Sequence, residues 1–178
     1  MITQRFPMTT GGLVKFTTAL SAVILAVVLP IQLYVVATFV PVGPLRAVVF
    51  SVLGLTVLGL GWAFLLAPRA VRLTGSRLAV ERLAWTDFEV PLREVTSFSP
   101  GPAMGLLGPV RRVAGNGGLM GFTGLFHVPD VGLVRAWVTQ LGVPTVIVRR
   151  AGGRPLLLGV DAPGELEAAL HQAGVPRQ

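Results

Sequence analysis

Two long runs of uncharged, mostly apolar residues stand near the start of the chain. They fill the intervals between Lys15, Arg46 and Arg69, and neither contains a lysine, arginine, aspartate or glutamate. The hydrocarbon layer of a bilayer is about 30 Å thick, and a helix of roughly 20 apolar residues crosses it. The pattern therefore predicts two transmembrane helices, over residues 16–40 and 47–67.

A short segment between the two runs predicts a tight turn. Residues 41–46 read Pro-Val-Gly-Pro-Leu-Arg, and two prolines with a glycine do not favour a continuous helix. Pro30 lies inside the first run, where a transmembrane helix tolerates a kink. We therefore expect a transmembrane hairpin over residues 16–68, preceded by an N-terminal tail of residues 1–15.

Basic residues around the two runs predict how the hairpin is oriented. Arg46 alone lies in the turn, whereas the remaining basic residues of this region lie beyond the outer ends: Arg5, Lys15, Arg69, Arg72, Arg77 and Arg82. Cytoplasmic loops of membrane proteins carry the excess of lysine and arginine. We expect a multi-pass protein of a bacterial cytoplasmic membrane, with the tail and both termini on the cytoplasmic side.

The two runs have two other interpretations. The first run follows a basic start, as the apolar part of a secretory signal peptide does, but it is longer than such a part and a second run follows at once. Two buried helices of a soluble protein would each show a polar face, and neither run shows one. The hairpin accounts for the pattern better than either alternative.

After residue 68 the pattern changes to short β-type runs separated by glycine, proline and serine. Over residues 88–93, apolar and polar side chains alternate with the period of two that is typical of a half-buried strand. Further strands are expected over residues 70–73, 78–85, 134–139, 145–150 and 155–160. Such closely spaced strands predict an antiparallel meander or a small β-barrel.

One amphipathic helix is predicted at the end of the chain. Its apolar stripe has the spacing i, i+3, i+4 and i+7 and consists of Leu166, Ala169, Leu170 and Ala173. We expect Asp161 to cap its N-terminus and Gly174 to end it. The fold class predicted for residues 69–178 is therefore α+β, a small antiparallel barrel with a C-terminal helix.

This arrangement resembles that of a bacterial pleckstrin-homology domain family. The resemblance is carried by a glycine- and aromatic-rich segment over residues 115–126, by the run at 132–139, and by the sequence Asp-Ala-Pro before the final helix. The placement of the domain after two membrane spans is similar as well. His127 and Trp137 depart from the family pattern, which has a more basic turn and a tyrosine there. The resemblance implies a pleckstrin-homology-like domain and no particular reaction or cofactor.

Charge and composition narrow the range of partners. The formal net charge is +7, and the arginines are scattered along the chain rather than gathered on one predicted element. Nucleic-acid binding normally shows a clustered basic helix or stripe, so no nucleic-acid partner is predicted. An anionic membrane surface accounts for the same charge. Because the chain has no cysteine, disulfide bonds and thiolate chemistry are excluded.

The glycine-rich segment over residues 115–124 has three interpretations. A phosphate-binding loop would need a following Lys-Ser/Thr, or a strand before it and a helix after it, and the sequence predicts neither. In the favoured interpretation, the glycines permit bends that let nearby apolar side chains pack onto the barrel, namely Met120, Phe122, Leu125 and Phe126. In the third, Met120 and Phe122 contact lipid or a partner.

Arginines supply the other candidate contacts. Arg111 and Arg112 precede the glycine-rich segment, and Arg149, Arg150 and Arg154 surround a predicted hairpin. The planar guanidinium matches the geometry of a phosphate group, so either set could bind a lipid headgroup. Solvated surface arginines are the simpler alternative.

No catalytic, metal or cofactor site is predicted. His127 and His171 are the two histidines, and neither is accompanied by a cysteine or a pair of carboxylates. We therefore predict a non-enzymatic binding or scaffold protein at the cytoplasmic membrane face, with its hairpin in contact with membrane lipids. The partner is expected to be an unidentified protein or a second copy of the chain, and lipid headgroups are a further candidate. The alternative is a non-catalytic accessory subunit of a membrane enzyme or transporter complex.

Overall fold

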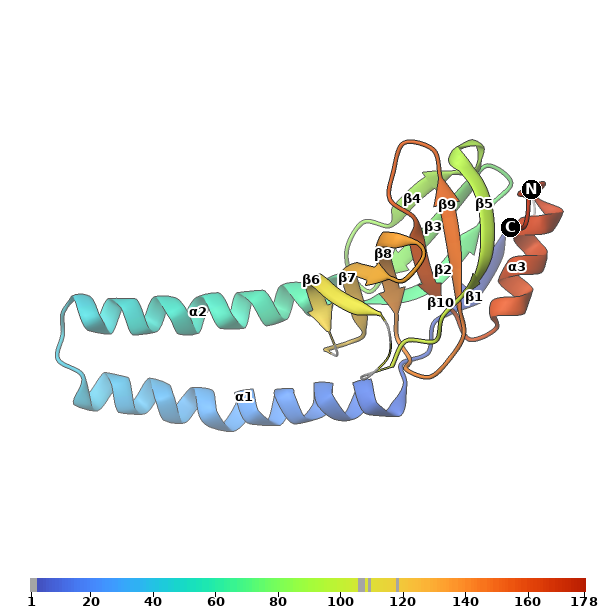
Figure 1. Cartoon of the computed structure of the whole chain (residues 1–178). Helices are drawn as coiled ribbons and strands as arrows, with labels where there is room; N and C mark the ends of the chain where they lie inside the picture. The colour runs from blue at the N-terminus through green and yellow to red at the C-terminus, as the bar shows by residue number, and fades with distance from the viewer. Residues whose placement is uncertain (1–2, 106–107, 109, 118) are drawn as a thin grey trace.

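The computed structural model of the chain describes residues 3–105, 108, 110–117 and 119–178. It consists of a long helical hairpin and a β-rich domain at one end of that hairpin (Figure 1). The C-terminus lies on the side of the domain that faces away from the hairpin.

Two helices form the hairpin. Helix α1 covers Gly12–Phe39 and helix α2 covers Pro44–Leu65, and they run side by side from the domain to a short turn at the far end (Figure 1). At 1.5 Å per residue, their lengths are about 42 and 33 Å. Both helices are long and apolar enough to cross a membrane, and Pro30 remains within α1.

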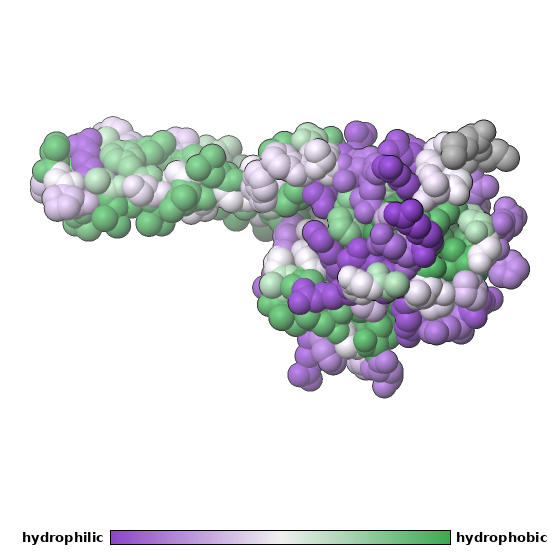
Figure 2. All heavy atoms as spheres, turned by 90° about the horizontal axis from the view of Figure 1, so that it is seen from above, coloured by the Kyte–Doolittle hydropathy of each residue, from purple (hydrophilic) through white to green (hydrophobic). Residues whose placement is uncertain are grey.

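Apolar side chains cover the hairpin on all sides. Tyr34, Phe39, Leu55 and Leu58 are each at least 67% exposed. Figure 2 shows the hairpin in green and white along most of its length, with hydrophilic atoms at the far tip. Such a surface is unfavourable in water and favourable in an apolar environment, because exposed apolar area is costly to hydrate.

Both helices begin earlier than predicted. Helix α1 starts at Gly12 instead of residue 16, and Val14 in its first turn is only 1% exposed because it packs against the domain. Helix α2 starts at Pro44 instead of residue 47, since proline is well suited to the first turn, where its missing N–H would have no helical partner. The turn between the helices is therefore shorter than the predicted segment.

A four-stranded antiparallel sheet forms one layer of the domain, in the order β1-β2-β3-β4. The strands are β1 Gln4–Pro7, β2 Pro68–Leu73, β3 Arg77–Arg82 and β4 Phe88–Pro91. The predicted strand over residues 70–73 is present within β2, and the strands predicted over 78–85 and 88–93 end earlier than expected, at Arg82 and Pro91. A short 3-10 helix, Leu92–Glu94, leads from β4 to the second layer.

The N-terminal residues differ from the predicted tail. Strand β1 pairs with β2, so that Phe6 lies opposite Val71, and Phe6 is buried. Met8 is buried too, and its N–H donates a hydrogen bond to the carbonyl oxygen of Arg69. A strand this short has no periodic pattern of its own, and its partner lies beyond the whole hairpin in the sequence. Pairing across that distance therefore makes residues 4–8 part of the domain.

A six-stranded sheet forms the second layer, in the order β5-β9-β10-β8-β7-β6. Its strands are β5 Val95–Gly101, β6 Arg111–Gly117, β7 Phe122–Val128, β8 Gly132–Val138, β9 Thr145–Arg150 and β10 Leu156–Gly159. Strands β8 and β10 are parallel, whereas the other neighbours are antiparallel. The domain is therefore built from two open sheets followed by a terminal helix, which is consistent with the barrel-like α+β fold that was predicted. It departs from the all-antiparallel pattern of that prediction, because β10 inserts between β8 and β9 and runs parallel to β8.

Two apolar clusters fill the domain. The larger lies between the two sheets and helix α3, Pro163–Gln172, and its fully buried members include Val71, Val80, Phe98, Leu156, Leu166 and Leu170. The smaller combines residues of the six-stranded sheet with Val14 of α1. Burial of each large aliphatic or aromatic side chain contributes about 1.5–3 kcal/mol. The hairpin and the domain thus share part of one core.

Helix α3 confirms the predicted terminal helix, with a shorter apolar stripe. Leu166, Ala169 and Leu170 are buried as predicted, and Gly174 ends the helix with φ +82°. Ala173, however, is exposed, and Val175 contributes to the core in its place. The chain turns at Gly174, so the helical spacing does not extend to i+7.

Asp161 does not cap α3, as was predicted. The N-cap residue is Ala162, and no side chain caps it. The Oδ1 atom of Asp161 instead accepts hydrogen bonds from the N–H and the hydroxyl of Thr9, both at 2.9 Å, and from Gln140 Nε2 at 3.2 Å. Asp161 therefore joins the N-terminal segment to the C-terminal part of the domain.

Candidate functional site

The glycine-rich segment forms a β-hairpin at the junction between the domain and the helices. Strands β6 and β7 pair across it, and Phe122 is buried in the smaller apolar cluster. In the turn, the N–H of Met120 donates to Thr18 Oγ1 of α1 at 3.0 Å. Phe122 therefore has a packing role and is not available as a surface contact, whereas Met120 contacts the first helix.

Two glycines allow this hairpin to close. Gly115 and Gly124 lie directly opposite each other, with φ +115° and +133°. A β-carbon at Gly115 would lie 2.3 Å from the carbonyl oxygen of Thr123, and one at Gly124 would lie 2.4 Å from that of Ala114. No side chain fits at either position, so bare backbone forms the surface at this point.

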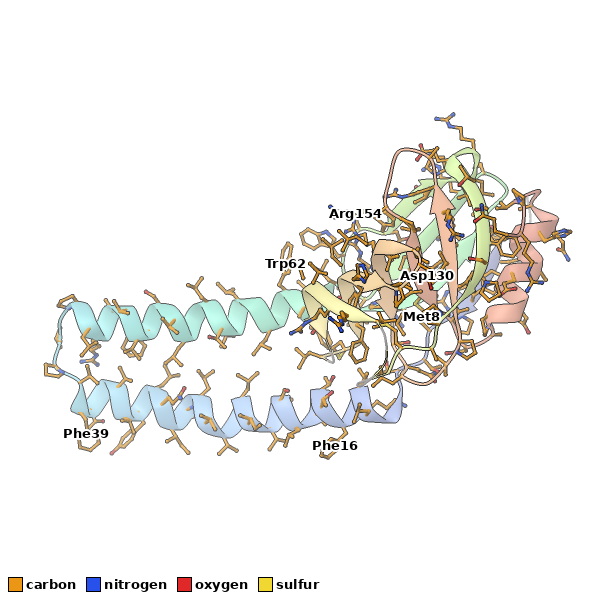
Figure 3. The ribbon with its side chains drawn as sticks, in the orientation of Figure 1. Met8, Phe16, Phe39, Trp62, Asp130 and Arg154 are labelled. Carbon is orange, nitrogen blue, oxygen red and sulfur yellow. The ribbon has the colours of Figure 1, made fainter. Side chains whose placement is uncertain are left out.

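A groove separates the end of α2 from the six-stranded sheet. Its first part has a volume of about 330 Å³ and lies between Trp62 of α2 and Trp137 of β8. A second part of about 530 Å³ adjoins it, and the two share Gly115, Gly124 and Arg135. We call the two parts together the arginine groove, after the four arginines that line it: Arg82, Arg135, Arg150 and Arg154. Figure 3 shows Trp62 at the domain end of α2 and Arg154 nearby on the domain.

The alternation of β8 directs Arg135 and Trp137 into the groove. Their neighbours along the strand, Val134, Ala136 and Val138, belong to the smaller apolar cluster on the opposite face. Trp137 is itself only 3% exposed and lines the groove as a member of the larger cluster. The groove face continues onto β7, where residues 123 and 125 lie opposite Trp137 and Arg135.

Aromatic rings hold two of the guanidinium groups in place. The Cζ atom of Arg135 lies 4.6 Å from the ring centroid of Phe88 and 5.1 Å from that of Trp137, and Arg150 Cζ lies 5.5 Å from Phe88. Arg150 Nε also donates to the carbonyl oxygen of Arg154 at 3.0 Å. Stacking of this kind fixes an arginine without using most of its N–H donors.

Carboxylates do not neutralise this cluster. The ion pairs among described side chains involve other arginines, namely Arg5, Arg72, Arg77 and Arg177. The Nε atom of Arg82 is buried and has no hydrogen-bond partner among the residues that the structure describes. Asp87 is near Arg82, but it pairs with Arg72 at 3.0 Å. Among the described side chains, no carboxylate forms an ion pair with the four groove arginines, and Asp87 acts on Arg82 only from a distance.

The pKa values of two groove arginines reflect this arrangement. Burial lowers the pKa of Arg82, and the negative charge of Asp87 partly opposes that effect. Burial also lowers the pKa of Arg135, and the neighbouring cations Arg82 and Arg150 lower it further. Each shift means that the folded protein holds the charged form at a cost, which a bound anion would relieve.

The arginines selected from the sequence fall into three groups. Arg150 and Arg154 line the groove. Arg149 points elsewhere and donates to Gln178 Oε1 at 2.6 Å and to Ser99 Oγ at 3.3 Å. Arg111 and Arg112 are exposed on β6 and are absent from the described lining of the groove.

Two groove arginines were not selected from the sequence. The sequence could have indicated Arg135, because it lies on a predicted strand between a valine and an alanine that are buried, and two residues before a tryptophan. No local feature of the sequence indicated Arg82, because only the packing of β3 beside α2 and β8 brings it to the groove.

The groove offers chemistry for binding an anion. It combines guanidinium donors with aromatic and glycine surfaces. Among the described residues, no group of three or more histidine, cysteine, aspartate or glutamate side chains is placed to hold a metal ion.

Comparison of the chain with protein-family models, with curated proteins and with solved structures gives no match. The resemblance to bacterial pleckstrin-homology domains stays a prediction from the sequence.

Proposed function

We propose that this chain is a membrane-anchored binding protein without catalytic activity. Its two helices hold the β domain at the cytoplasmic face of a bacterial membrane, and the arginine groove is the binding site. A pleckstrin-homology-like identity of the domain is part of the proposal. The two sheets and the terminal helix support that identity, and the parallel pair β8 and β10 departs from the antiparallel pattern that it implies.

One observation is the main support for the proposal: residues of the helical hairpin and residues of the domain both line the groove. Four residues near the end of α2 form one wall, namely Gly59, Trp62, Ala63 and Leu66. Residues of strands β3, β6, β7 and β8 form the other, with Arg82 and Arg135 among them. Only two residues separate α2 from β2. If α2 crosses the bilayer, the groove opens at the level of the lipid headgroups, where an anion-binding domain would meet its ligand.

The cytoplasmic location follows from charge. Lysine and arginine are concentrated on the domain side of the hairpin, whereas Arg46 alone lies near the turn at the other end. A reporter enzyme fused after Gln178 should therefore be active in the cytoplasm, and the same reporter inserted at Val42 should be active on the opposite side. The reverse pattern would contradict the proposed orientation.

Photo-crosslinking tests the binding function of the groove. A photoreactive amino acid at Thr123, on the groove wall, should capture a ligand in intact membranes. The same amino acid at Thr96, exposed on β5, is the matched control. Identical adducts at both positions, or none at Thr123, would overturn the assignment of the groove as the binding site.

A second candidate function is supported by the edge of the six-stranded sheet. Among the described strands, β6 pairs with β7 alone, and Val113 in it is 61% exposed. Such an edge accepts a further strand from another chain. A protein partner, a second copy of this chain or the core of a larger membrane complex could bind there, and replacing Val113 with proline should then abolish the association without affecting the groove.

A further inference from the structure

We propose that the arginine groove binds the phosphate group of an anionic phospholipid drawn from the membrane that holds the chain. This inference rests on the proposed function and specifies its ligand. Phosphate oxygens would accept hydrogen bonds from the guanidinium groups, and the lipid glycerol and first acyl carbons would lie along α2.

The cationic side of the groove fits a phosphate group. Arg135 and Arg150 are oriented by contacts with Phe88, and stacking on a ring does not use the N–H groups that lie in the guanidinium plane. Arg82 contributes a buried Nε donor without a partner among the described residues. Guanidinium groups bind phosphate oxygens through paired, charge-assisted hydrogen bonds. A ligand with several acceptor oxygens would therefore pair with the terminal N–H groups of Arg135 and Arg150, beside the positive charge of Arg82.

The opposite side of the groove fits the apolar part of a lipid. Its wall consists of glycine, alanine, leucine and Trp62 from the last turns of α2. Trp62 is half exposed, and tryptophan favours the boundary between headgroups and hydrocarbon. A soluble phosphate ligand would leave this wall uncovered, so the amphipathic lining favours a lipid over a free anion.

The size of the groove agrees with this ligand. The two parts have volumes of about 330 and 530 Å³, within the range of roughly 300–1,000 Å³ that is usual for small-molecule sites. The glycine pair Gly115 and Gly124 lies where the two parts meet and places no side chain there. The junction is therefore lined by backbone at the two glycines and by the side chain of Arg135, which both parts share.

Tryptophan fluorescence of the full chain tests the inference. The chain has three tryptophans; Trp62 and Trp137 line the groove, and Trp85 contacts Trp62. The purified full chain in a neutral detergent should change its emission when a short-chain phosphatidic acid or phosphatidylglycerol is added. Phosphatidylcholine, which has no net charge, and inorganic phosphate at the same concentration should have little effect.

Matched variants make the test specific to the groove. The double substitution Arg135→Gln/Arg150→Gln should weaken anionic-lipid binding at least about tenfold, since each arginine near an anionic headgroup contributes on the order of 1 kcal/mol. Arg69→Gln/Arg93→Gln removes the same charge from exposed positions outside the groove and should leave the affinity within about twofold. Equal losses in the two double variants would overturn the inference.

A third variant covers the case in which the groove double variant does not fold. Arg154 lies in an exposed turn, so Arg154→Gln should keep the fold and weaken lipid binding about fivefold. Unchanged binding in Arg154→Gln, or no response of the wild-type chain to any anionic lipid, would contradict the inference.

The remaining outcomes separate this inference from the proposed function. An equal response to inorganic phosphate and to lipid would assign the groove to a soluble phosphate ligand and overturn the lipid assignment. A protein adduct at Thr123 without lipid binding would preserve the proposed function and also overturn the lipid assignment.

Discussion

The indole rings of Trp62 and Trp85 contact each other, with ring centroids 4.6 Å apart and ring planes at 59°. Trp62 belongs to the last turns of α2, and Trp85 lies between β3 and β4. This contact attaches the hairpin to the four-stranded sheet, as the hydrogen bond from Met120 to Thr18 attaches it to the six-stranded sheet. The domain is therefore held on the hairpin by tertiary contacts as well as by the chain.

Replacing Trp62 should loosen this attachment. We expect Trp62→Ala to reduce the free energy of unfolding by about 0.5–1.5 kcal/mol through the lost ring contact, in addition to the lost burial. Chemical denaturation in detergent, followed by circular dichroism, measures the change. Phe39→Ala, at the far end of the hairpin, removes a 71% exposed ring and is the control. An equal loss in both variants would show that the ring contact is not important.

The glycine pair of the β6–β7 hairpin should not tolerate a side chain. Gly115→Ala places a β-carbon against facing backbone, and we expect it to reduce the free energy of unfolding by about 3 kcal/mol or more. Gly132 also has a positive φ, of +86°, but a β-carbon added there would have no other atom within 4 Å. Gly132→Ala should therefore cost only about 1–2 kcal/mol. Similar losses at the two positions, measured by chemical denaturation, would contradict the close approach of β6 and β7.

The N-terminal strand should contribute strongly to stability. Phe6 is 6% exposed in the larger apolar cluster, so Phe6→Ala should cost about 3–5 kcal/mol of unfolding free energy. Its neighbour Arg5 forms an exposed ion pair with Glu81 at 2.8 Å, and Arg5→Ala should cost no more than about 1 kcal/mol. If residues 1–15 were a free tail, neither substitution would change the denaturation midpoint.

We expect the buried cation of Arg82 to reduce the free energy of unfolding, although it contributes to anion binding in the groove. Because burial lowers its pKa, the cation is less favourable in the folded chain than in the unfolded chain. That cost is fully present at every pH below the folded-state pKa, and therefore at neutral pH. It decreases only as the pH rises above that pKa toward the higher pKa of the unfolded chain. Arg82→Met keeps the apolar stem and removes the unpaired Nε, so we expect the melting temperature to rise by about 2–4 °C.

Arg93→Met is the control for this effect. Arg93 is exposed, and its replacement should leave the melting temperature unchanged within about 1 °C. A melting temperature of Arg82→Met below that of the wild-type chain would indicate that Arg82 stabilises the fold instead.

Elements with a strong local pattern were predicted well. The two apolar runs form helices, the strands β2, β4, β8, β9 and β10 lie close to their expected positions, and α3 ends at Gly174. Strands β1, β5, β6 and β7 were not predicted. Strand β1 is very short, and β6 is exposed along almost its whole length. Neither of these two shows the alternation that reveals a half-buried strand.

The candidate site was predicted only in part. Arg150 and Arg154 were selected because arginine suits phosphate, and both line the groove. Arg149, adjacent to Arg150, was selected for the same reason, yet its position on the strand directs it to Gln178. Residue type thus selected the arginines, and the face of the strand decided which of them lines the groove.

The sequence alone determined the elements whose stability depends on neighbours a few residues away: two apolar helices, the turn between them, most strands and the terminal helix. Only the tertiary structure decided that β1 completes a sheet, that β10 lies between β8 and β9, and that Arg82 and Arg135 share a groove with Trp62. The physical reason is the range of the interactions. Helical and strand periodicity acts within a few residues, whereas strand pairing and the packing of α2 beside β8 join segments that the sequence keeps far apart.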